Sequence, residues 1–361
     1  MTSLTVLRAD ALYTPDRVEP PVIAVADGLV VATGVAAARL GDPVAVTGTI
    51  VPAMVDLQVN GGDGVDLQQP EPDRRRLHRW LAAGGVLTYA PTLVSAPLAR
   101  MAALASGLAG EVDGVLALKP HFEGPFLSGS RLGAHDRAAV SGADAAKVGE
   151  VAAALASYVT LAPEREGAGD LVRRLVAAGV PVSAGHSDAT QAEAEAGMRL
   201  GITQVTHLFN AMRPMHHREP GLAGAALMGP AGPSVGVIAD GVHVSPSMVL
   251  LASRLLGDRM YLVSDAVAAA GRDGESRLSD GTLAGSVTRL DEGLRNLLSW
   301  GIDPVAAVTA VTAAPAAAAG LSRRGRLAPG YSDLVALVDA GWMVRCAGPA
   351  ADLLAATVKA G

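Results

Sequence analysis

Eight short apolar runs, separated by alanine-rich segments, constrain the fold of this chain more than any other feature. Most of the intervening segments have helical character, and several end in glycine, as helix C-termini often do. Near-continuous apolar strands that alternate with helices indicate a parallel sheet, and eight such βα repeats predict an α/β fold of the (β/α)8 TIM-barrel type. The strand candidates are IVPAMVDLQVN, VLTYAPT, VLALKPHFEG, YVTLAPE, PVSAGHS, ITQVTHLFN, SVGVIADG and MYLVSDA.

The two ends of the chain have a different pattern. Residues 1–50 alternate apolar and polar positions in short runs, and Ala26-Asp27-Gly28 is typical of a hairpin turn. A similar strand-and-turn pattern closes the chain, in GRLAPGYSDLVALVDAGWMVRCAG. We therefore predict a small β-sandwich domain built from residues 1–50 and 325–361, and a barrel domain over residues 51–324.

Composition excludes several classes of function. A net charge of −6 and an aromatic content of 3% argue against a nucleic-acid partner, which needs positive charge and stacking surfaces. The single cysteine, Cys346, leaves no disulfide framework and no cysteine-based zinc site, and it fits a reducing compartment. The N-terminus has neither a basic start nor an uninterrupted apolar segment. We expect a cytoplasmic protein with no membrane or nucleic-acid partner.

Side chains that can bind a metal stand at the ends of three predicted strands: Glu123, His186 and His207. In a parallel barrel these strand ends meet at one rim. Two imidazoles and a carboxylate, with an open position for water, suit a catalytic divalent ion such as zinc. A lone histidine is more often a hydrogen-bonded structural residue, but three such residues at three strand ends favour a metal site.

Three neighbouring residues bear on the number of metal ions. His121 lies two residues before Glu123 and faces the same side of the strand, so it is a rival ligand or, as we favour, a partner that orients the ligands. The first barrel strand ends with Gln58 and Asn60 at alternating positions, where two histidines would make a second site. Amides are poor zinc ligands, so the sequence predicts one tightly bound ion.

Two residues are candidates for moving protons or polarising a substrate. Asp265 ends the last predicted strand, where a carboxylate can take a proton from a water molecule and return it to a leaving group. Its structural alternative is to cap a following helix. His135 lies in the glycine-containing loop SGSRLGAHDR and could reach over the site to polarise a carbonyl, although a loop histidine is usually only solvated.

Other candidates for substrate contacts lie in loops that follow the predicted strands. Asn210, Ala211 and Arg218 belong to HLFNAMRPMHHREPGLAGA, a loop rich in His, Arg and Gly that could hold an anion or simply be a basic surface loop. His243 comes just after the seventh strand and could bind substrate. The glycine-rich DGTLAGS could bring backbone amides close to a ligand, but a plain turn is equally consistent with its spacing.

Taken together, these motifs resemble the N-acetylglucosamine-6-phosphate deacetylase family of the amidohydrolase superfamily. The resemblance covers nearly the whole chain, and its most specific motifs are HFEGPF, SAGHS and THLFNAM. It implies hydrolysis of N-acetyl-D-glucosamine 6-phosphate to D-glucosamine 6-phosphate and acetate, in amino-sugar catabolism. Another N-acetylated amino sugar phosphate, such as the galactosamine form, is the alternative substrate. An inactive binding protein on the same fold is the alternative from another class.

The resemblance also implies a role for each site residue. The metal ligands fall on Glu123, His186 and His207, the catalytic base and acid on Asp265, and the histidine that orients the substrate carbonyl on His135. The implied cofactor is one divalent ion per subunit, zinc first, with iron, cobalt or manganese as alternatives. The residues implied to contact the sugar phosphate or line its pocket are Asn210, Ala211, Arg218, His243, Leu283, Ala284 and Gly285.

Two further implications concern assembly and a local departure. In this family the arginine of the REPG motif is supplied across a dimer interface, so the resemblance implies a homodimer in which Arg218 reaches the neighbouring active site. Family members usually carry an extra β-hairpin before the GTLAGS-like segment, whereas here only RDGESRLSD stands between Gly271 and Gly281. The shortened segment bears on substrate range and local stability.

Overall fold

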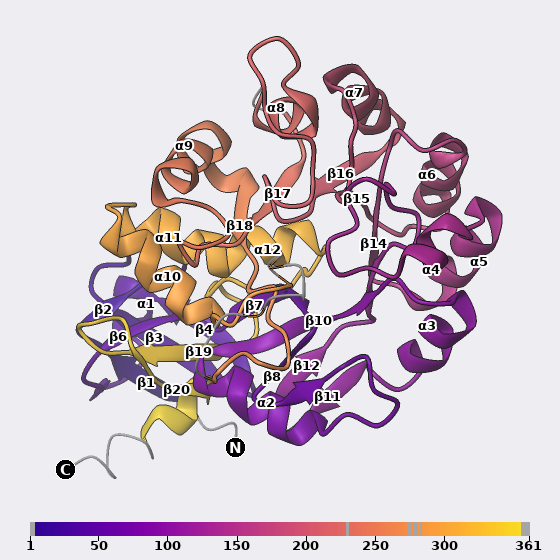
Figure 1. Cartoon of the computed structure of the whole chain (residues 1–361). Helices are drawn as coiled ribbons and strands as arrows, with labels where there is room; N and C mark the ends of the chain where they lie inside the picture. Colours follow the sequence, from indigo (N-terminus) through magenta and orange to yellow (C-terminus); the bar gives the residue numbers. More distant parts are fainter. Residues whose placement is uncertain (1–3, 229–230, 273–275, 277–280, 282–283, 355–361) are drawn as a thin grey trace.

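The structure is a computed structural model of the whole chain, in which a long parallel sheet is surrounded by helices and a smaller β region lies at one side (Figure 1). The residues whose structure is described here are 4–228, 231–272, 276, 281 and 284–354.

Eight strands of the largest sheet run parallel, and each pairs with the next along the chain. An isolated parallel bridge also joins Val59, at the end of the first of them, to Ala266, just beyond the last. The eight strands are β7 (Met54–Val59), β10 (Val86–Val94), β13 (His121–Glu123), β14 (Tyr158–Leu161), β15 (Val182–Ala184), β16 (Ile202–Val205), β17 (Ser234–Val237) and β18 (Met260–Leu262).

Two of the predicted strands are each divided in the structure. The run at 50–60 contains β6 (Thr49–Pro52), which pairs in a different sheet, before β7 begins at Met54. The run at 115–124 contains β12 (Val115–Ala117) and β13, with Pro120 between them. Proline has no N–H to donate to a ladder, so a strand boundary at this position follows from its chemistry. Together with β11 (Gly110–Val112), β12 forms a hairpin beside β10.

The helices between the parallel strands bury their apolar stripes against the sheet. In α6 the buried residues Leu171, Val172 and Leu175 recur at helical spacing. Helix α7 begins with a capping box of Thr190 and Glu193. The principal helices are α2 (Arg74–Ala83), α3 (Leu98–Ala105), α5 (Ala145–Leu155), α6 (Ala168–Ala177), α7 (Gln191–Leu200), α8 (Gly221–Leu227), α9 (Pro246–Leu256), α10 (Leu290–Ser299), α11 (Pro304–Val311) and α12 (Ala313–Ala318).

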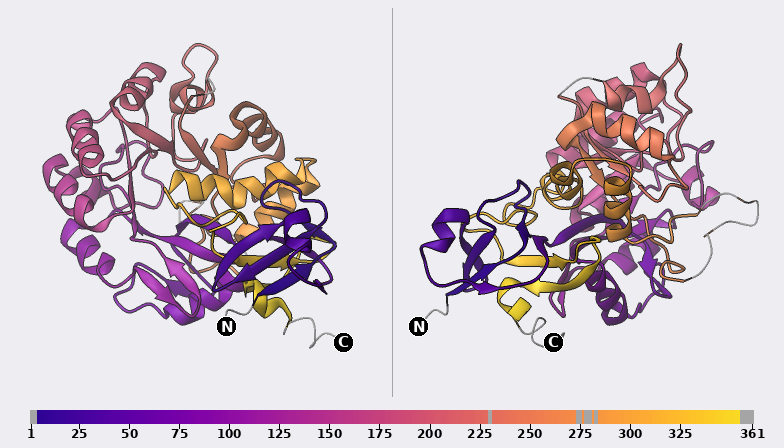
Figure 2. Two further views of the ribbon diagram at one scale, coloured as in Figure 1. Left: turned by 180° about the vertical axis from the view of Figure 1, so that it is seen from behind. Right: turned by 90° about the vertical axis from the view of Figure 1, so that its left-hand side faces the viewer.

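Strands from both ends of the chain pair in one four-stranded sheet, of order β2-β6-β19-β20 (Figure 2). A second four-stranded sheet, β4-β3-β1-β5, lies in the N-terminal part, and buried apolar residues of both sheets, including Leu7 and Leu337, share one core cluster. In the described part of the chain, no helix has the length and apolar character needed to cross a membrane. The strands are β1 (Thr5–Arg8), β2 (Ala11–Leu12), β3 (Val22–Ala26), β4 (Leu29–Thr33), β5 (Val44–Ala45), β19 (Leu334–Val338) and β20 (Val344–Pro349).

Candidate metal centre

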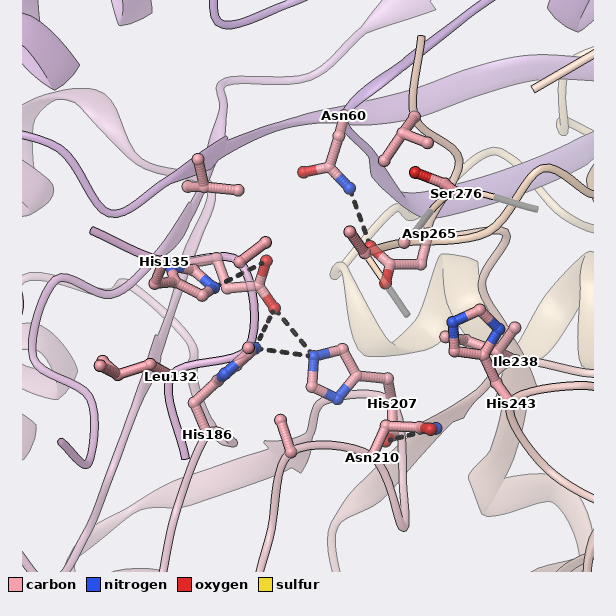
Figure 3. A pocket seen from close by; sticks show the side chains of 18 of the residues that line it. Asn60, Leu132, His135, His186, His207, Asn210, Ile238, His243, Asp265 and Ser276 are labelled. Atoms are coloured by element: carbon pink, nitrogen blue, oxygen red, sulfur yellow. Dashed lines mark hydrogen bonds and ion pairs between the residues drawn. The ribbon is translucent and has the colours of Figure 1, made fainter. Parts of the chain in front are cut away.

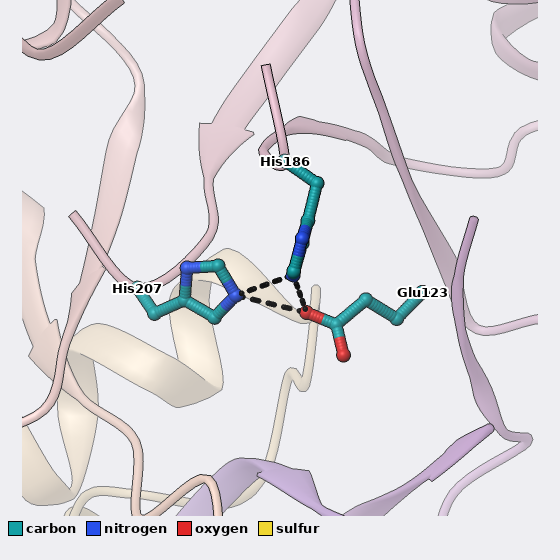
Figure 4. A group of neighbouring side chains, drawn as sticks. All are labelled: Glu123, His186 and His207. Carbon is teal, nitrogen blue, oxygen red and sulfur yellow. Dashed lines mark hydrogen bonds and ion pairs between the residues drawn. The ribbon is translucent and has the colours of Figure 1, made fainter. Parts of the chain in front are cut away.

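Glu123, His186 and His207 converge at the carboxyl ends of three parallel strands (Figure 4). Oε1 of Glu123 lies 2.9 Å from Nε2 of His207 and 3.2 Å from Nε2 of His186, and the two Nε2 atoms are 3.1 Å apart. All three side chains are buried. The structure therefore brings together the three residues that the sequence singled out, although they are separated by up to 84 positions.

The backbone turns sharply where the two histidines leave their strands. His186 and His207 have φ values of 47° and 31°, in the left-handed region that residues with a Cβ rarely adopt. Such a conformation costs about 1 kcal/mol or more and persists where the surroundings fix it. Gly185 is equally constrained, because a Cβ there would lie 2.8 Å from Cγ2 of Thr160 and 2.9 Å from Cβ of Thr206. The SAGHS motif therefore has its glycine where no larger residue fits.

The three side chains fit a divalent metal ion by their chemistry and their orientation. Nδ1 of His186 donates a hydrogen bond to the carbonyl oxygen of Arg131 at 2.8 Å, which leaves the lone pair of Nε2 facing the cluster. Burial opposes ionisation of Glu123, but its close contacts with His186 and His207 outweigh burial and hold the pKa of its carboxyl well below the usual value. Two neutral imidazoles and one carboxylate are ligands that a catalytic divalent ion takes. Within the described residues this is the one group of three or more such side chains so placed.

Two amide side chains of the first barrel strand hydrogen-bond to the carboxylates of the site. Nε2 of Gln58 donates to Oε1 of Glu123 at 3.0 Å, and Nδ2 of Asn60 donates to Oδ1 of Asp265 at 2.8 Å. The sequence had identified both amides only as residues that are poor metal ligands. The structure gives each amide a role, because each donates a hydrogen bond that orients a carboxylate of the site.

His121 does not join the metal cluster. Its Nε2 lies 2.7 Å from Oγ1 of Thr160 and its Nδ1 lies 3.2 Å from Oγ1 of Thr92, so both ring nitrogens are occupied by hydroxyl groups. Its ring stacks on Tyr158 with 3.9 Å between the ring centroids. Burial lowers the pKa of His121 to about 3, so its ring is neutral. It belongs to a buried polar layer beneath the cluster and is not a rival ligand.

Asp265 lies beside the cluster with its carboxylate buried in the pocket wall (Figure 3). It too has a positive φ, 49°, which turns the side chain inward at the end of β18. Burial, and then repulsion from Glu123, raise the pKa of Asp265 to about 6. In the described chain no helix begins directly after it, so the alternative role as a helix cap is not realised.

His135 is placed against the cluster by the loop that follows β13. Its Nε2 lies 3.7 Å from Oε2 of Glu123, and its ring meets the ring of His186 edge to face, with 4.3 Å between centroids. The backbone N–H of Ser95 donates to its Nδ1 at 3.0 Å. Burial, and then the proximity of His186, lower the pKa of His135 to about 3. A loop position that sequence alone would leave solvated is therefore part of the site.

The cluster forms part of the wall of a cavity of about 740 Å³. Several residues that the sequence proposed for substrate contacts line it, whereas Arg218 does not: it is exposed, and its Nη1 lies 2.8 Å from Nε2 of the neighbouring His217. Leu283 lies outside the described residues. The expected substrate-contact residues that line the cavity are His135, Asn210, Ala211, His243, Ala284 and Gly285.

His243 enters the cavity in a fixed orientation. Its Nδ1 donates to Oδ2 of Asp240 at 2.6 Å, while its buried Nε2 has no hydrogen-bond partner within the described residues. The hydroxyl of Ser286 lies 3.3 Å from the same carboxylate oxygen. Neither Asp240 nor Ser286 is among the site residues that the sequence predicts, because no local pattern shows that they meet His243.

Comparisons with known proteins agree with this geometry. Residues 49–343 match the model of the Amidohydrolase family. The chain is 35% identical over 311 residues to an N-acetylglucosamine-6-phosphate deacetylase from Bos taurus, covering 76% of this chain and 75% of that protein. It is also 32% identical to an N-acetylgalactosamine-6-phosphate deacetylase from Escherichia coli O157:H7, covering 87% of this chain and 91% of that protein.

A solved structure extends the likeness to nearly the whole chain. A mutant of N-acetyl-D-glucosamine-6-phosphate deacetylase from Mycobacterium smegmatis, solved in complex with N-acetyl-D-glucosamine-6-phosphate, superposes with a TM-score of 0.88. The two sequences are 31% identical, and the match covers 96% of this chain and 97% of that one.

Proposed function

The chain belongs to the amidohydrolase family, and we propose that it removes the acetyl group of N-acetyl-D-glucosamine 6-phosphate to give D-glucosamine 6-phosphate and acetate, a step of amino-sugar catabolism. One observation carries the proposal. Glu123, His186 and His207 converge beside the Asp265 carboxylate in the same cavity, on a chain related over three quarters of its length to deacetylases of this substrate.

A divalent metal ion held by Glu123, His186 and His207, for which we propose zinc, would polarise and acidify the attacking water. Each of the three residues offers one ligand atom, a ring nitrogen or a carboxylate oxygen, and these atoms lie within 4.8 Å of one another. Gln58 hydrogen-bonds to the same carboxylate and occupies a position where a second ion would need a ligand. We therefore propose one ion per subunit.

Asp265 moves the proton. Its Oδ1 is occupied by the Asn60 amide, so Oδ2 is the oxygen available to accept a proton from water as the water oxygen bonds to the acetamide carbon. When the carbon–nitrogen bond breaks, the same carboxyl returns the proton to the departing amine. His135 stands on the other side of Glu123 and would donate a hydrogen bond to the carbonyl oxygen as negative charge develops there.

The phosphate group needs positive charge, and the described residues of the cavity wall offer little that is unpaired. Arg131 is the one arginine or lysine among the described residues that line the cavity, and its guanidinium is already paired with Asp188 at 2.6 Å. Arg218 is exposed on the loop after β16 and does not line its own cavity. We propose a homodimer in which Arg218 of each subunit binds the substrate phosphate in the neighbouring subunit.

The galactosamine epimer is a second candidate substrate, because the Escherichia coli relative named for it matches this chain over 87% of its length. The two sugars differ in configuration at one ring carbon, so contacts to that hydroxyl would distinguish them. Ser276 and Gly281, two described residues in and at the end of the shortened segment, line the same cavity.

We also propose an architecture for the regions around the site. The bridge between Val59 and Ala266 supports closure of the eight parallel strands into a barrel over residues 51–324. The shared core of the two terminal sheets supports a small β-sandwich domain from residues 1–50 and 325–361. The single cysteine supports a reducing, cytoplasmic location.

The decisive experiment measures amine release from N-acetylglucosamine 6-phosphate by purified, zinc-loaded protein, with the galactosamine epimer and both unphosphorylated sugars alongside. Turnover of the glucosamine form, with a strong preference for the phosphorylated sugar, is the expected result. A preference for the other epimer would favour the second candidate. No turnover of any of the four sugars by folded, metal-bound protein would refute the deacetylase proposal.

A further inference from the structure

Ser95, the first residue after β10, contacts the ring of His135 through two of its atoms. Its backbone N–H donates to Nδ1 at 3.0 Å, and its Oγ lies 2.8 Å from the same nitrogen. We propose that Ser95 is a positioning residue that fixes His135 in the tautomer with its hydrogen on Nε2. His135 then serves the reaction only as a hydrogen-bond donor. The inference deepens the proposed deacetylation and rests on it for the identity of the acceptor.

The tautomer follows from the donor inventory of the two residues. A backbone N–H can only donate, so the nitrogen that it faces must offer a lone pair. Nδ1 of His135 is therefore without hydrogen, and a neutral imidazole then carries its hydrogen on Nε2. Nε2 is the ring nitrogen nearer the metal ligands, 3.7 Å from Oε2 of Glu123 (Figure 3).

Ser95 is itself held rigidly. Its hydroxyl lies 3.1 Å from the backbone oxygen of Glu123, to which it can donate. The Ser95 hydroxyl can donate its hydrogen either to the backbone oxygen of Glu123 or to Nδ1 of His135. In both cases Nδ1 itself carries no hydrogen. Ser95 is buried, with 3% of its surface exposed, so no water competes readily for these contacts.

Gly124 of the HFEGPF motif leaves the space that Ser95 occupies. A Cβ at this position would overlap Oγ of Ser95 and lie 2.8 Å from Cγ of Leu127. Its φ of 84° also disfavours any residue with a side chain. Gly124, which follows the proposed metal ligand Glu123, therefore leaves the room in which Ser95 approaches. The position of Ser95 thus depends on β13, the strand that carries Glu123.

The fixed tautomer divides the chemistry between two residues. A base needs a free lone pair directed at the water, and His135 has none on the side that faces the cavity. A donor at this position can instead stabilise the charge that develops on a carbonyl oxygen, which enzymes commonly do with fixed N–H groups. Proton transfer is then left to Asp265, whose Oδ2 is not engaged by Asn60.

The tautomer can be observed without substrate. The full-length, zinc-loaded protein would be labelled with ¹⁵N-histidine, and long-range ¹H–¹⁵N spectra recorded at pH 7; with only eight histidines, His135 is identified by the signals that disappear in His135→Gln. We expect a protonated, pyrrole-type Nε2 and a hydrogen-bonded, pyridine-type Nδ1. A hydrogen on Nδ1, in the neutral or the doubly protonated ring, would overturn the inference.

The kinetics of three variants at His135 provide a second test of the proposal. His135→Ala should lower kcat by about 10²-fold, as expected for loss of one donor to a developing oxyanion. His135→Gln, which keeps a side-chain N–H, should recover part of that loss, whereas His135→Glu, which offers only a base, should not. A Glu variant as active as the Gln variant would contradict the donor assignment. All three should be compared at equal metal content.

Ser95→Ala tests the positioning residue itself, with Ser106→Ala at the exposed end of α3 as the matched control. Because the backbone N–H remains, kcat should fall by less than the ~10²-fold expected for His135→Ala, with little change in KM. The control should behave as wild type. If Ser95→Ala left both kcat and the His135 spectrum unchanged, the backbone N–H of residue 95 alone would position His135. That result would overturn the role proposed for the Ser95 hydroxyl.

The two proposals fail in different ways. If the protein turns over none of the phosphorylated sugars but the spectrum shows hydrogen on Nε2, the proposed function is wrong and the tautomer assignment stands. If the enzyme is active and the hydrogen is on Nδ1, only the inference about Ser95 is wrong.

Discussion

The Asn60 side chain donates a 2.8 Å hydrogen bond to Oδ1 of Asp265, across 205 positions of sequence. The bond joins the residue that follows the first parallel strand, β7, to a residue three positions beyond the last, β18, beside the bridge between Val59 and Ala266. Because Asn60 occupies Oδ1, the buried Asp265 carboxylate can accept a proton only at Oδ2.

Asn60→Ala should slow the reaction without removing the metal. Loss of the donor leaves the Asp265 carboxylate less stabilised in its ionised form, so its pKa should rise and the acidic limb of the kcat/KM profile should move to higher pH. We expect kcat at pH 7 to fall by about tenfold, in line with one hydrogen bond to a charged group. A pH–rate profile on zinc-loaded protein measures this. An acidic limb that moves to lower pH would contradict the assignment.

Asp265→Asn should fold and bind metal yet lose at least ~10³-fold in kcat, because the amide keeps the shape of the carboxylate but cannot accept the proton. Metal content and melting temperature measured on the same sample separate a chemical defect from a folding defect. If the purified variant kept substantial turnover, Asp265 would not be the base.

Glu123→Gln should weaken metal binding, because it removes the negative charge that both ligand histidines face at 2.9 and 3.2 Å. We expect the stoichiometry after dialysis against a weak chelator to fall well below one ion per subunit, and activity to return only with excess zinc. Glu150→Gln, on the exposed face of α5, is the matched control and should retain full stoichiometry. Equal retention by both variants would argue against Glu123 as a ligand.

Asp56 should make stability depend on pH. Burial raises its pKa to about 7, and its Oδ2 has no hydrogen-bond partner within the described residues. In the folded state Asp56 therefore keeps its proton up to about pH 7, whereas in the unfolded chain it loses the proton near pH 4. The contribution of Asp56 to stability consequently falls as the pH rises from about 4 to about 7, and it stays low at higher pH. The shift corresponds to at most about 4 kcal/mol.

Asp56→Asn removes this titration. Measured by urea unfolding at several pH values between 5 and 8, the stability of the variant relative to wild type should increase with pH and level off above about pH 7. Comparing the two proteins at each pH cancels the pH dependence of metal binding, which they share. A difference that is constant, or that decreases with pH, would show that Asp56 is ionised in the folded protein.

Gly185→Ala should destabilise the fold and reduce metal binding together, because the new Cβ would meet Thr160 and Thr206 at 2.8 and 2.9 Å. Overpacking of this kind costs typically about 1–3 kcal/mol, and the adjacent His186 would be displaced. Gly107→Ala is the control, since a Cβ there meets nothing within 4 Å. Thermal melts and zinc titrations of both variants provide the test. An unchanged Gly185→Ala protein would mean that the strand end can shift freely.

The sequence by itself determined which strands carry the metal-binding side chains. A parallel strand ends where its apolar run ends, so Glu123, His186, His207 and Asp265 could be placed on one edge of the sheet before any contact was known. The alternation of strands and helices predicted the parallel α/β sheet for the same reason, because the spacing of apolar residues within a short segment indicates whether it forms a strand or a helix. Local pattern is less reliable where one apolar run serves two sheets, as at residues 50–60.

Only the tertiary structure decided how these side chains are oriented and which of their atoms are free. The pairs Ser95 with His135 and Asn60 with Asp265 are separated by 40 and 205 positions, and no periodicity in the chain relates them. The exposed position of Arg218, outside its own cavity, is likewise invisible in the REPG motif. A hydrogen bond forms only when its donor and acceptor atoms lie within about 3 Å of each other. For residues far apart in the sequence, the packing of the whole sheet determines that distance, and the local sequence does not.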